Sequence, residues 1–478
     1  MRMLLSLLVL VLISNLSAKE NALWQRKIAK NSNYTSRARL IAVDKGQFFV
    51  CSYFQTAKEK NKRPITFLFN GGPGAASIWL HLGCVGPRKV KLKRDGRATA
   101  PPFDLVDNPH TWLPFTDLVF IDPMGTGFSH CKDKDKETDF WGVKKDIESV
   151  AKVIEKILSL EKRWLSPKYL VGESYGTLRA AGLIEQLHEI HGIHLNGVMF
   201  ISPAIDYTTN KNAPGNLLPY VLLLPTYTAT AYLHKLLPKR FQKLSEAMDE
   251  AEEFAYKEYL PAIYRGGSQT DKEFTKVAQK FCDLTGLSFS YAKSRRLLVD
   301  KTQYAAELLR KKKKVIGCFD SRLYAFTENP TAERVSFDPG DFQGTGPYVA
   351  AANHYLRSEL KIDMTIPYHF YRNEIWEKWE WTGAPKKGHG FLNMVPMLGR
   401  EFRKNKNLYL FFATGLYDLV TPYMTAGYTV SQMQLPKSQM YRITNRPYPG
   451  GHMFYGNEKA LAAFTKDVKN WYQKSSKK

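Results

Sequence analysis

The stretch Tyr169-Leu170-Val171-Gly172-Glu173-Ser174-Tyr175-Gly176 carries the most information about the fold of this 478-residue chain. Tyr169 to Val171 is a short apolar run typical of a buried strand, and the residues from Gly176 onward are compatible with a helix. Between them, the pattern G-x-S-x-G places two glycines around a serine, and the glycines permit a sharp strand-to-helix turn. We therefore predict a nucleophile elbow that exposes the Ser174 hydroxyl at the carboxyl edge of a sheet.

Strand and helix patterns alternate on both sides of the elbow. Apolar residues recur at three-to-four spacing between residues 143 and 158, as in an amphipathic helix. Short apolar runs typical of strands occur at Ile65 to Phe69, Leu118 to Ile121, Val198 to Ile201, Leu408 to Phe412 and Met440 to Ile443, and a β-hairpin pattern spans about residues 38 to 56. This order predicts an α/β-hydrolase fold with a mostly parallel central sheet and helices on both faces.

The alternation stops after about residue 205. Residues 206–390 are richer in charged helical stretches and aromatic side chains, and they predict a helical cap inserted into the sheet domain. Residues 19–205 and 391–478 would then form the catalytic core. The sequence contains no evident internal repeat.

A serine hydroxyl becomes a nucleophile only when a base takes its proton and an acid orients that base. In this fold the chain order is serine, acid, histidine. Asp418 follows the predicted strand 408–412, and His452 lies in a glycine-containing loop after the strand predicted at 440–443. Ser174, Asp418 and His452 are therefore the predicted nucleophile, orienting acid and base.

Several motifs in one order resemble the serine carboxypeptidase family of the α/β-hydrolase clan, in the manner of a bacterial-type member. The matching segments are Asn70-Gly71-Gly72-Pro73-Gly74, Asp122 to Ser129, the elbow Gly172 to Gly176, Gly415 to Pro422, and Gly451-His452-Met453. The resemblance covers most of residues 40 to 205 and 405 to 460.

The resemblance implies roles for the residues around the triad. The amides of Gly72 and Tyr175 would form the oxyanion hole, and Met453 would line the pocket for the last side chain of the substrate. Substrate binding through the terminal carboxylate would involve Asn70, the Gly71 amide and Glu173. Because a carboxyl group donates a hydrogen bond only when protonated, binding through Glu173 should strengthen in acid.

The chain departs from the family pattern at three positions. Cys84 occupies the place where many members have a second glutamate, Ala75 replaces a disulfide cysteine, and Leu68 replaces a tryptophan. The triad prediction does not depend on these positions, whereas the pH optimum and strict specificity for the carboxyl end do.

The first residues have the pattern of a secretory signal peptide. Arg2 precedes the apolar run Leu4 to Ile13, and small and polar residues lead to Ala18. We expect cleavage after residue 18 and a secreted or periplasmic mature protein; an uncleaved membrane anchor is the alternative.

Basic residues are in large excess, with a formal net charge of +24. The excess is spread along the chain, and its densest run, Arg310 to Lys314, is interpreted as a solvated helix face. We expect weak association with anionic surfaces and no nucleic acid as partner.

Of the five cysteines at least one must stay unpaired, and no C-x-x-C spacing is present.

The sequence offers no pattern for a metal or cofactor. His188, His191 and His194 are interpreted as a solvated helix end near Gly192, because H-E-x-x-H is absent. No nucleotide-binding glycine loop occurs, so we expect no cofactor.

The favoured function is a secreted serine carboxypeptidase acting on peptides. The alternatives are a serine esterase or acyltransferase, a hydrolase like proline iminopeptidase, and an inactive basic binding protein.

Overall fold

The computed structural model describes residues 26–31, 34–56, 59–381 and 391–476. The predicted signal peptide, residues 1–18, lies outside these ranges. Among the described helices, none combines the length and the hydropathy that a membrane span requires.

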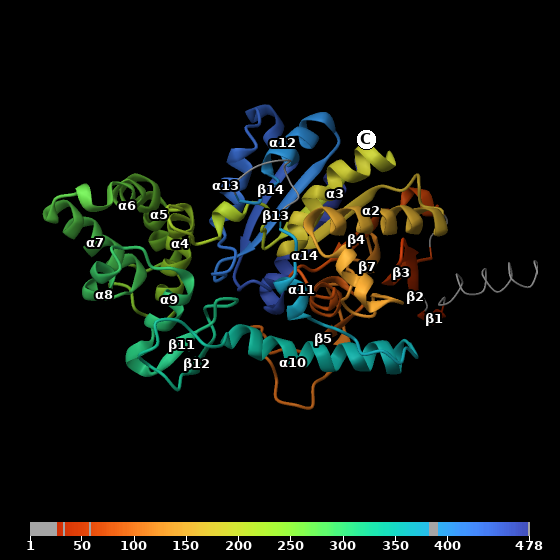
Figure 1. Cartoon of the computed structure of the whole chain (residues 1–478), viewed down its shortest axis with the longest axis horizontal. Coiled ribbons are helices and arrows are strands. Elements are labelled where there is room, and N and C mark those ends of the chain that lie inside the picture. Colours follow the sequence, from red (N-terminus) through yellow and green to blue (C-terminus); the bar gives the residue numbers. More distant parts are fainter. Residues whose placement is uncertain (1–25, 32–33, 57–58, 382–390, 477–478) are drawn as a thin grey trace, which may run out of the picture.

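A ten-stranded sheet forms the centre of the molecule, with the order β1-β2-β3-β7-β4-β9-β10-β13-β14 and β8 paired to β3 (Figure 1). All neighbours from β7 to β14 are parallel, whereas β1, β2, β3 and β7 pair antiparallel. The strands are β1 Arg26–Asn31, β2 Tyr34–Val43, β3 Gly46–Gln55, β4 Ile65–Phe69, β7 Asp117–Ile121, β8 His130–Cys131, β9 Lys168–Glu173, β10 Gly197–Ile201, β13 Tyr409–Gly415 and β14 Ile443–Tyr448. The mostly parallel sheet of the predicted α/β-hydrolase fold is confirmed.

Alternate residues of the central strands point to opposite faces of the sheet. In β4, Ile65, Phe67 and Phe69 join one apolar cluster, while Leu68 joins another on the opposite face. All four side chains are fully buried. Both faces must therefore be covered by helices, as in other parallel sheets.

Helices cover both faces of the sheet (Figure 1). The first cluster includes side chains of α2 Val143–Leu160, α3 Tyr175–His191 and α12 Val395–Lys404. The second includes α14 Glu458–Ser475 and part of α10 Pro339–His354. Gly182 of α3 allows a close approach to α2, because a Cβ at this position would lie 2.2 Å from Ile147 Cδ1.

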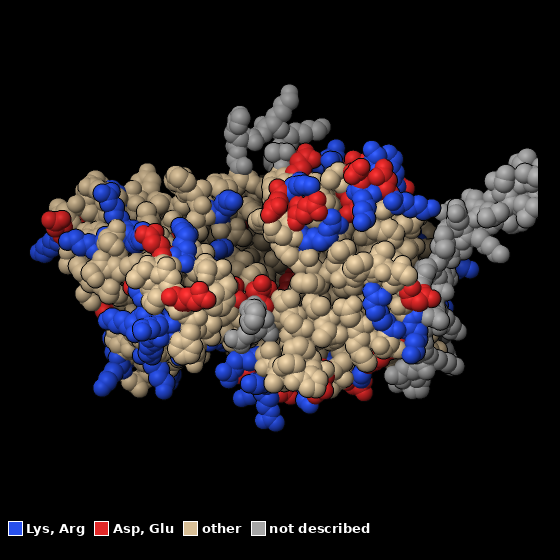
Figure 2. All heavy atoms as spheres, turned by 60° about the horizontal axis from the view of Figure 1, so that its bottom comes forward, with Lys and Arg blue, Asp and Glu red and all other residues tan. Residues whose placement is uncertain are grey.

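A separate helical lobe projects from the sheet domain and appears in green in Figure 1. It has an apolar cluster of its own, to which Leu419 of the core contributes. Figure 2 shows the surface hollowed where the lobe meets the rest of the molecule, with acidic side chains in the hollow. The helices of the lobe are α4 Leu218–Leu233, α5 Leu244–Phe254, α6 Leu260–Arg265, α7 Asp271–Thr285, α8 Phe289–Ser294 and α9 Lys301–Glu307.

The chain returns from the lobe to the core through a second group of elements. These are the hairpin β11 Lys314–Ile316 and β12 Tyr324–Phe326, then α10 and α11 Asn373–Glu377. Isolated bridges join this group to the core at Ala75–Tyr371, Gly127–His369 and Gly142–Glu380. The segment predicted as one cap thus comprises a lobe and a part packed on the sheet domain; the boundaries at 205 and 391 stay predictions. The remaining strands, β5 Arg88–Val90 and β6 Leu105–Asp107, pair with each other. A further helix of the core, α13 Met424–Gln432, precedes β14.

Two local predictions are wrong. Residues Lys437–Arg442 form a 3-10 helix, so the strand predicted at 440–443 begins only at Ile443. β14 is an edge strand with exposed residues and Pro447, so it lacks the apolar pattern of a buried strand. The prediction of a helix face at Arg310 to Lys314 is the second wrong one. Arg310–Lys312 form one 3-10 turn, and Lys314 begins β11.

The five cysteines Cys51, Cys84, Cys131, Cys282 and Cys318 are all buried and free. Burial raises the pKa of Cys51 to about 12, which keeps this thiol neutral. The cysteines therefore act as small apolar side chains of the core.

Candidate active site

Ser174 lies in a sharp turn between β9 and α3, as predicted. Its φ of 57° is in the left-handed region, which is costly for a residue with a side chain. The neighbouring glycines make this turn possible: a Cβ at Gly172 would lie 2.1 Å from the Gly176 carbonyl oxygen, and one at Gly176 would lie 2.8 Å from the Phe69 oxygen. The Ser174 amide donates to the Ile201 carbonyl of β10 at 3.0 Å, which fixes the turn to the sheet edge.

Asp418 and His452 meet at the carboxyl ends of β13 and β14. Asp418 Oδ2 and His452 Nδ1 are 2.7 Å apart, and both residues are buried. Asp418 Oδ1 accepts hydrogen bonds from the amides of Val420 at 2.8 Å and Thr421 at 3.0 Å. The carboxylate is therefore held in one orientation toward the imidazole.

The electrostatic environment of His452 suits a base. Burial by itself lowers the pKa of His452, but the carboxylates of Asp418 and, to a smaller extent, Glu173 raise it, and the net pKa lies above its ordinary value. Nε2 is buried and has no hydrogen-bond partner among the described residues. Because Nδ1 faces Asp418, Nε2 is the nitrogen left to accept a proton.

Ser202, at the end of β10, links the strand ends that carry the three predicted triad residues. Its amide donates to Ala413 of β13 at 2.8 Å, and its hydroxyl donates to the His452 carbonyl at 2.6 Å. Ser174 is tied to the residue before Ser202, as described above. The elbow and the two loops thus share one edge of the sheet, although the Ser174 hydroxyl and Nε2 are not hydrogen-bonded in this structure.

The loop after β4 packs directly on the elbow. A Cβ at Gly71 would lie 2.5 Å from the Tyr175 amide nitrogen, so only glycine permits this approach. Gly72 has a φ of 98°, again a backbone conformation that favours glycine. Tyr175 is the first residue of α3, and its amide has no acceptor within the helix. The two amides predicted for an oxyanion hole therefore lie on segments in contact.

Glu173 is a buried carboxyl group beside the elbow. Tyr455 donates to its Oε2 at 2.7 Å, and Asn70 hydrogen-bonds to the same side chain. Burial raises the pKa of Glu173 to about 7, against opposing effects of His452, Tyr455 and Asn70. Cys84 is close enough that Glu173 adds to the effect of burial in raising the pKa of this thiol. Glu173 is thus protonated in part near neutrality, with a neutral thiol as its neighbour.

Met453 borders a small pocket next to the histidine. The pocket is lined in part by Phe319, Tyr348 and Arg322. Phe319 also places its ring edge against His452, with 5.3 Å between ring centroids. The pocket therefore adjoins His452, and the role of Met453 in substrate binding stays a prediction.

A segment from the predicted insertion contacts the loops of both Asp418 and His452. The Cys318 carbonyl accepts from the Leu419 amide at 2.9 Å, and the Phe319 carbonyl accepts from the His452 amide at 2.6 Å. The Ser321 amide donates to Tyr417 at 3.0 Å. Residues 317–323 connect β11 to β12, so the turn of this hairpin contacts the loops of Asp418 and His452.

Asp338 supports that turn from the start of α10. Its carboxylate accepts from the amides of Cys318 at 2.7 Å, Phe319 at 3.1 Å, Gly340 at 2.7 Å and Asp341 at 3.3 Å. Four amide donors offset much of the cost of burying this charge, although burial still raises its pKa. Asp338 therefore fixes the hairpin turn to α10.

Sequence reasoning missed several of these residues. Thr421 donates to Asp418 Oδ2 at 2.6 Å, and its position three residues after an aspartate is a local signal that could have revealed it. Tyr455 and Phe319 carry no such signal, because their partners are distant in the sequence. Asp338 has a local signal as the cap of α10, since it accepts from the amides of Gly340 and Asp341, but its contacts with the hairpin turn have none.

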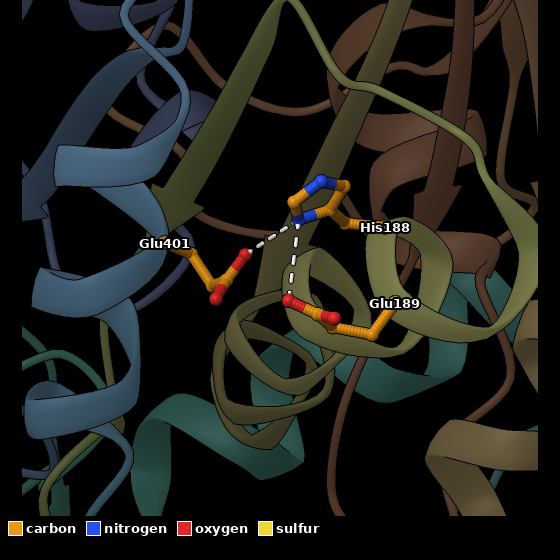
Figure 3. Close-up of side chains that lie close together, drawn as sticks. All are labelled: His188, Glu189 and Glu401. Atoms are coloured by element: carbon orange, nitrogen blue, oxygen red, sulfur yellow. Dashed lines mark hydrogen bonds and ion pairs between the residues drawn. The ribbon is translucent and has the colours of Figure 1, made fainter.

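A second histidine–carboxylate cluster lies between α3 and α12 (Figure 3). His188 Nδ1 is 3.0 Å from Glu401 Oε2 and 3.7 Å from Glu189 Oε1. These three residues have ligand atoms close enough to hold a metal ion. However, Lys404 Nζ lies 2.6 Å from Glu189 and 2.8 Å from Glu401, so an ammonium group already supplies the positive charge. The predicted helix end is confirmed, because α3 ends at His191 with Gly192 as its cap.

Comparison with known families gives a family match over almost the whole chain. A family model described as serine carboxypeptidase matches residues 29–471. A retinoid-inducible serine carboxypeptidase of Rattus norvegicus is 32% identical over 146 residues, 29% of this chain and 28% of that protein. A pheromone-processing carboxypeptidase KEX1 of Phytophthora infestans is 30% identical over 159 residues, 31% of this chain and 24% of that protein.

A plant relative gives a longer alignment. The serine carboxypeptidase-like 36 protein of Arabidopsis thaliana is 27% identical over 204 residues, 40% of this chain and 39% of that protein. The chain thus spans less than half the length of each of these curated relatives. Among solved structures, a carboxyl esterase from Bacillus coagulans has a TM-score of 0.41 at 12% identity, covering 92% of this chain and 99% of its own.

Proposed function

The chain belongs to the serine carboxypeptidase family, and on this premise we propose that it hydrolyses the last peptide bond of peptide substrates through an acyl-enzyme. The nucleophile is Ser174, the base is His452 and the group that orients the base is Asp418. The observation that carries the proposal is the buried Asp418–His452 pair, 2.7 Å apart, whose free Nε2 lies at the same sheet edge as the elbow.

In the first step, Ser174 Oγ attacks the carbonyl carbon of the last peptide bond while Nε2 of His452 takes the hydroxyl proton. Asp418 stabilises the imidazolium that forms and holds it in place. The hydroxyl must first approach Nε2, since the two are not hydrogen-bonded in this structure. Catalytic hydrogen bonds often tighten only when substrate binds. The negative charge that develops on the carbonyl oxygen is stabilised by the Gly72 and Tyr175 amides.

In the second step, His452 returns its proton to the amine of the departing residue as the carbon–nitrogen bond breaks. The remaining peptide stays attached to Ser174 as an ester. Water then attacks this ester, with His452 again taking a proton, and the free acid leaves. The reaction releases one amino acid and the shortened peptide.

Selection of the carboxyl end comes from neutral donors placed one residue beyond the attacked bond. Asn70, the Gly71 amide and protonated Glu173 bind the terminal carboxylate, and Met453 contacts the last side chain. Glu173 supports this role because its pKa, raised by burial to about 7, leaves it protonated below neutrality and therefore able to donate a hydrogen bond to a carboxylate.

The decisive experiment digests a peptide library and identifies the shortened end by mass spectrometry. We expect sequential loss from the carboxyl end, no cleavage when that end is amidated, and loss of all activity in Ser174→Ala with an unchanged unfolding temperature. Cleavage of amidated peptides would contradict the assignment.

The same assay distinguishes the other enzymes of this fold. Shortening from the amino end would favour a proline iminopeptidase-like hydrolase, and turnover of small esters without peptide cleavage would favour an esterase or acyltransferase. If a fluorophosphonate fails to label Ser174 and the protein binds anionic polymers in a salt-sensitive manner, an inactive basic binding protein is favoured.

We also propose secretion or periplasmic export, on the basis of the signal-peptide pattern in residues 1–18. Amino-terminal sequencing of the protein from its native compartment tests this. A mature chain beginning at Lys19 is expected, and a chain that retains residues 2–18 would contradict cleavage.

A further inference from the structure

The hairpin β11–β12 exposes a group of basic and aromatic side chains away from the active site. Its turn, residues 317–323, contacts the catalytic loops, whereas its other end is open to solvent. Figure 2 shows basic side chains gathered on the underside of the lobe, in the region of α8, α9 and this hairpin. We call Lys311, Lys312, Lys313, Tyr324 and Phe326 the hairpin patch.

The lysines of the hairpin patch carry uncompensated charge. Lys311, Lys312 and Lys313 are exposed, and the structure gives none of them an ion pair with a described residue. Among the acidic residues from 307 to 333, Glu307 pairs with Arg310, Asp320 with Arg322 at 2.6 Å and Glu333 with Arg295 at 2.7 Å. Only Glu328 is left to offset the three lysines. The positive potential is therefore free to act on a partner.

Two aromatic side chains accompany these lysines at the surface. Tyr324 and Phe326 lie on the same face of β12 and are 46% and 73% exposed. Lys314 of β11 lies opposite Phe326, and its Nζ is 3.8 Å from the Tyr324 ring centre and 5.1 Å from that of Phe326. This cation–π contact orients both rings without covering them.

We propose that the hairpin patch binds the surface of membranes that contain anionic lipids. Lysine ammonium groups pair with lipid phosphates, and aromatic rings gain free energy when they enter the boundary between headgroups and acyl chains. A soluble anionic polymer offers the first interaction and lacks the second. The reason to choose lipid is Phe326, a large apolar side chain that is 73% exposed beside the lysines.

The hairpin patch is connected to the active site through the turn of the same hairpin. The same hairpin contacts the loop of His452 through the Phe319 carbonyl, at 2.6 Å from the His452 amide. A protein docked through the hairpin patch therefore holds its active-site cleft in a defined orientation to the lipid surface.

The test is sedimentation of the full-length mature protein with vesicles of phosphatidylcholine, with and without phosphatidylglycerol. We expect binding only to the anionic vesicles, and weaker binding at high salt. The triple variant Lys311→Gln/Lys312→Gln/Lys313→Gln should bind roughly a hundredfold more weakly, since each lysine near the surface contributes about a fivefold change.

A matched control removes the same charge elsewhere. Lys459, Lys466 and Lys469 are exposed on α14 of the core, and their triple change to glutamine should leave vesicle binding unchanged. Equal unfolding temperatures of the two triple variants show that both are folded. An equal loss of binding in both would mean that net charge, not the hairpin patch, is responsible, and would overturn the proposal.

Phe326→Ser separates lipid from other polyanions. This variant should bind anionic vesicles severalfold more weakly and bind a soluble sulfated polysaccharide as the parent does. If Phe326→Ser leaves vesicle binding unchanged, or if the hairpin lysines prove irrelevant, the hairpin patch is not a lipid-binding surface.

Discussion

The molecule contains two histidine–carboxylate pairs of similar geometry and different surroundings. Asp418 and His452 are 2.7 Å apart, and Glu401 and His188 are 3.0 Å apart. In the first pair both residues are buried and Nε2 of the histidine has no described partner. In the second, the histidine is partly exposed and Lys404 neutralises the carboxylate.

This difference shows that distance between two side chains does not define a site. Asp418 is fixed by two amides and a hydroxyl, which leaves its charge directed at one imidazole nitrogen. Glu401 shares its charge between an imidazole and an ammonium group. Only the first arrangement combines a buried pair, a ring nitrogen without a partner among the described residues and a serine elbow at the same sheet edge.

The largest expected effect comes from removing His452 of the first pair. His452→Ala should lower kcat/KM on the order of 10⁵-fold, because no other group can take the Ser174 proton. The matched change His188→Ala should leave kcat/KM unchanged. Steady-state kinetics on a peptide with a free carboxyl end measure both, and comparable losses would contradict the assignment of the base.

Asp418→Asn should lower kcat by about 10⁴-fold, because an amide no longer stabilises the imidazolium or selects the correct tautomer. The control Glu401→Gln should retain full activity. Pre-steady-state measurement of acyl-enzyme formation locates the defect in the chemical step. A loss confined to KM would show that Asp418 acts in binding instead.

Asp338→Asn tests whether Asp338, which fixes the hairpin turn, helps to position the Asp418–His452 pair. We expect a fall in kcat of about 10- to 100-fold, because the turn that holds His452 loses part of its fixation and small displacements are costly. The rate of Ser174 labelling by a fluorophosphonate, measured per folded molecule, should fall in parallel. A lower unfolding temperature with a normal labelling rate would limit Asp338 to a structural role.

The pH dependence of KM should depend on Glu173. Below its raised pKa of about 7 the group is protonated and donates to the substrate carboxylate; above it the ionised group repels that carboxylate. KM should therefore rise with pH through this value, by up to about tenfold per pH unit. In Glu173→Gln the KM should be nearly independent of pH, and an unchanged profile would exclude this role.

The smallest effect concerns the second pair. Because Lys404 already neutralises Glu189 and Glu401, added Zn²⁺ should leave the unfolding temperature unchanged. In the control Lys404→Met the carboxylates lose their cation, and Zn²⁺ should then stabilise the protein. Stabilisation of the unchanged protein by Zn²⁺ would show that the cluster is a metal site.

The elements near the elbow were predicted well because their signals are local. β4, β9 and β10 are short buried strands bounded by turns, and α2 has a clear apolar stripe. β14 was misplaced because an edge strand with one solvent-exposed face has no such pattern. The division of residues 206–390 into a lobe and a packed segment depends on contacts with the core that no local pattern encodes.

The sequence alone determined the elbow at Ser174, because the glycines that permit the turn stand beside the serine in the chain. It also located Asp418 and His452, because the order serine, acid, histidine and the predicted strand ends can be followed along the chain. Only the tertiary structure decided that the acid and the base lie 2.7 Å apart and that Glu173 is desolvated beside Tyr455. It also decided that a hairpin turn from residues 317–323 supports the histidine loop. These features depend on burial and on contacts between segments that are separated in the chain, by 34 residues for the acid and the base and by 282 for Glu173 and Tyr455. Such contacts exist only once the chain has folded.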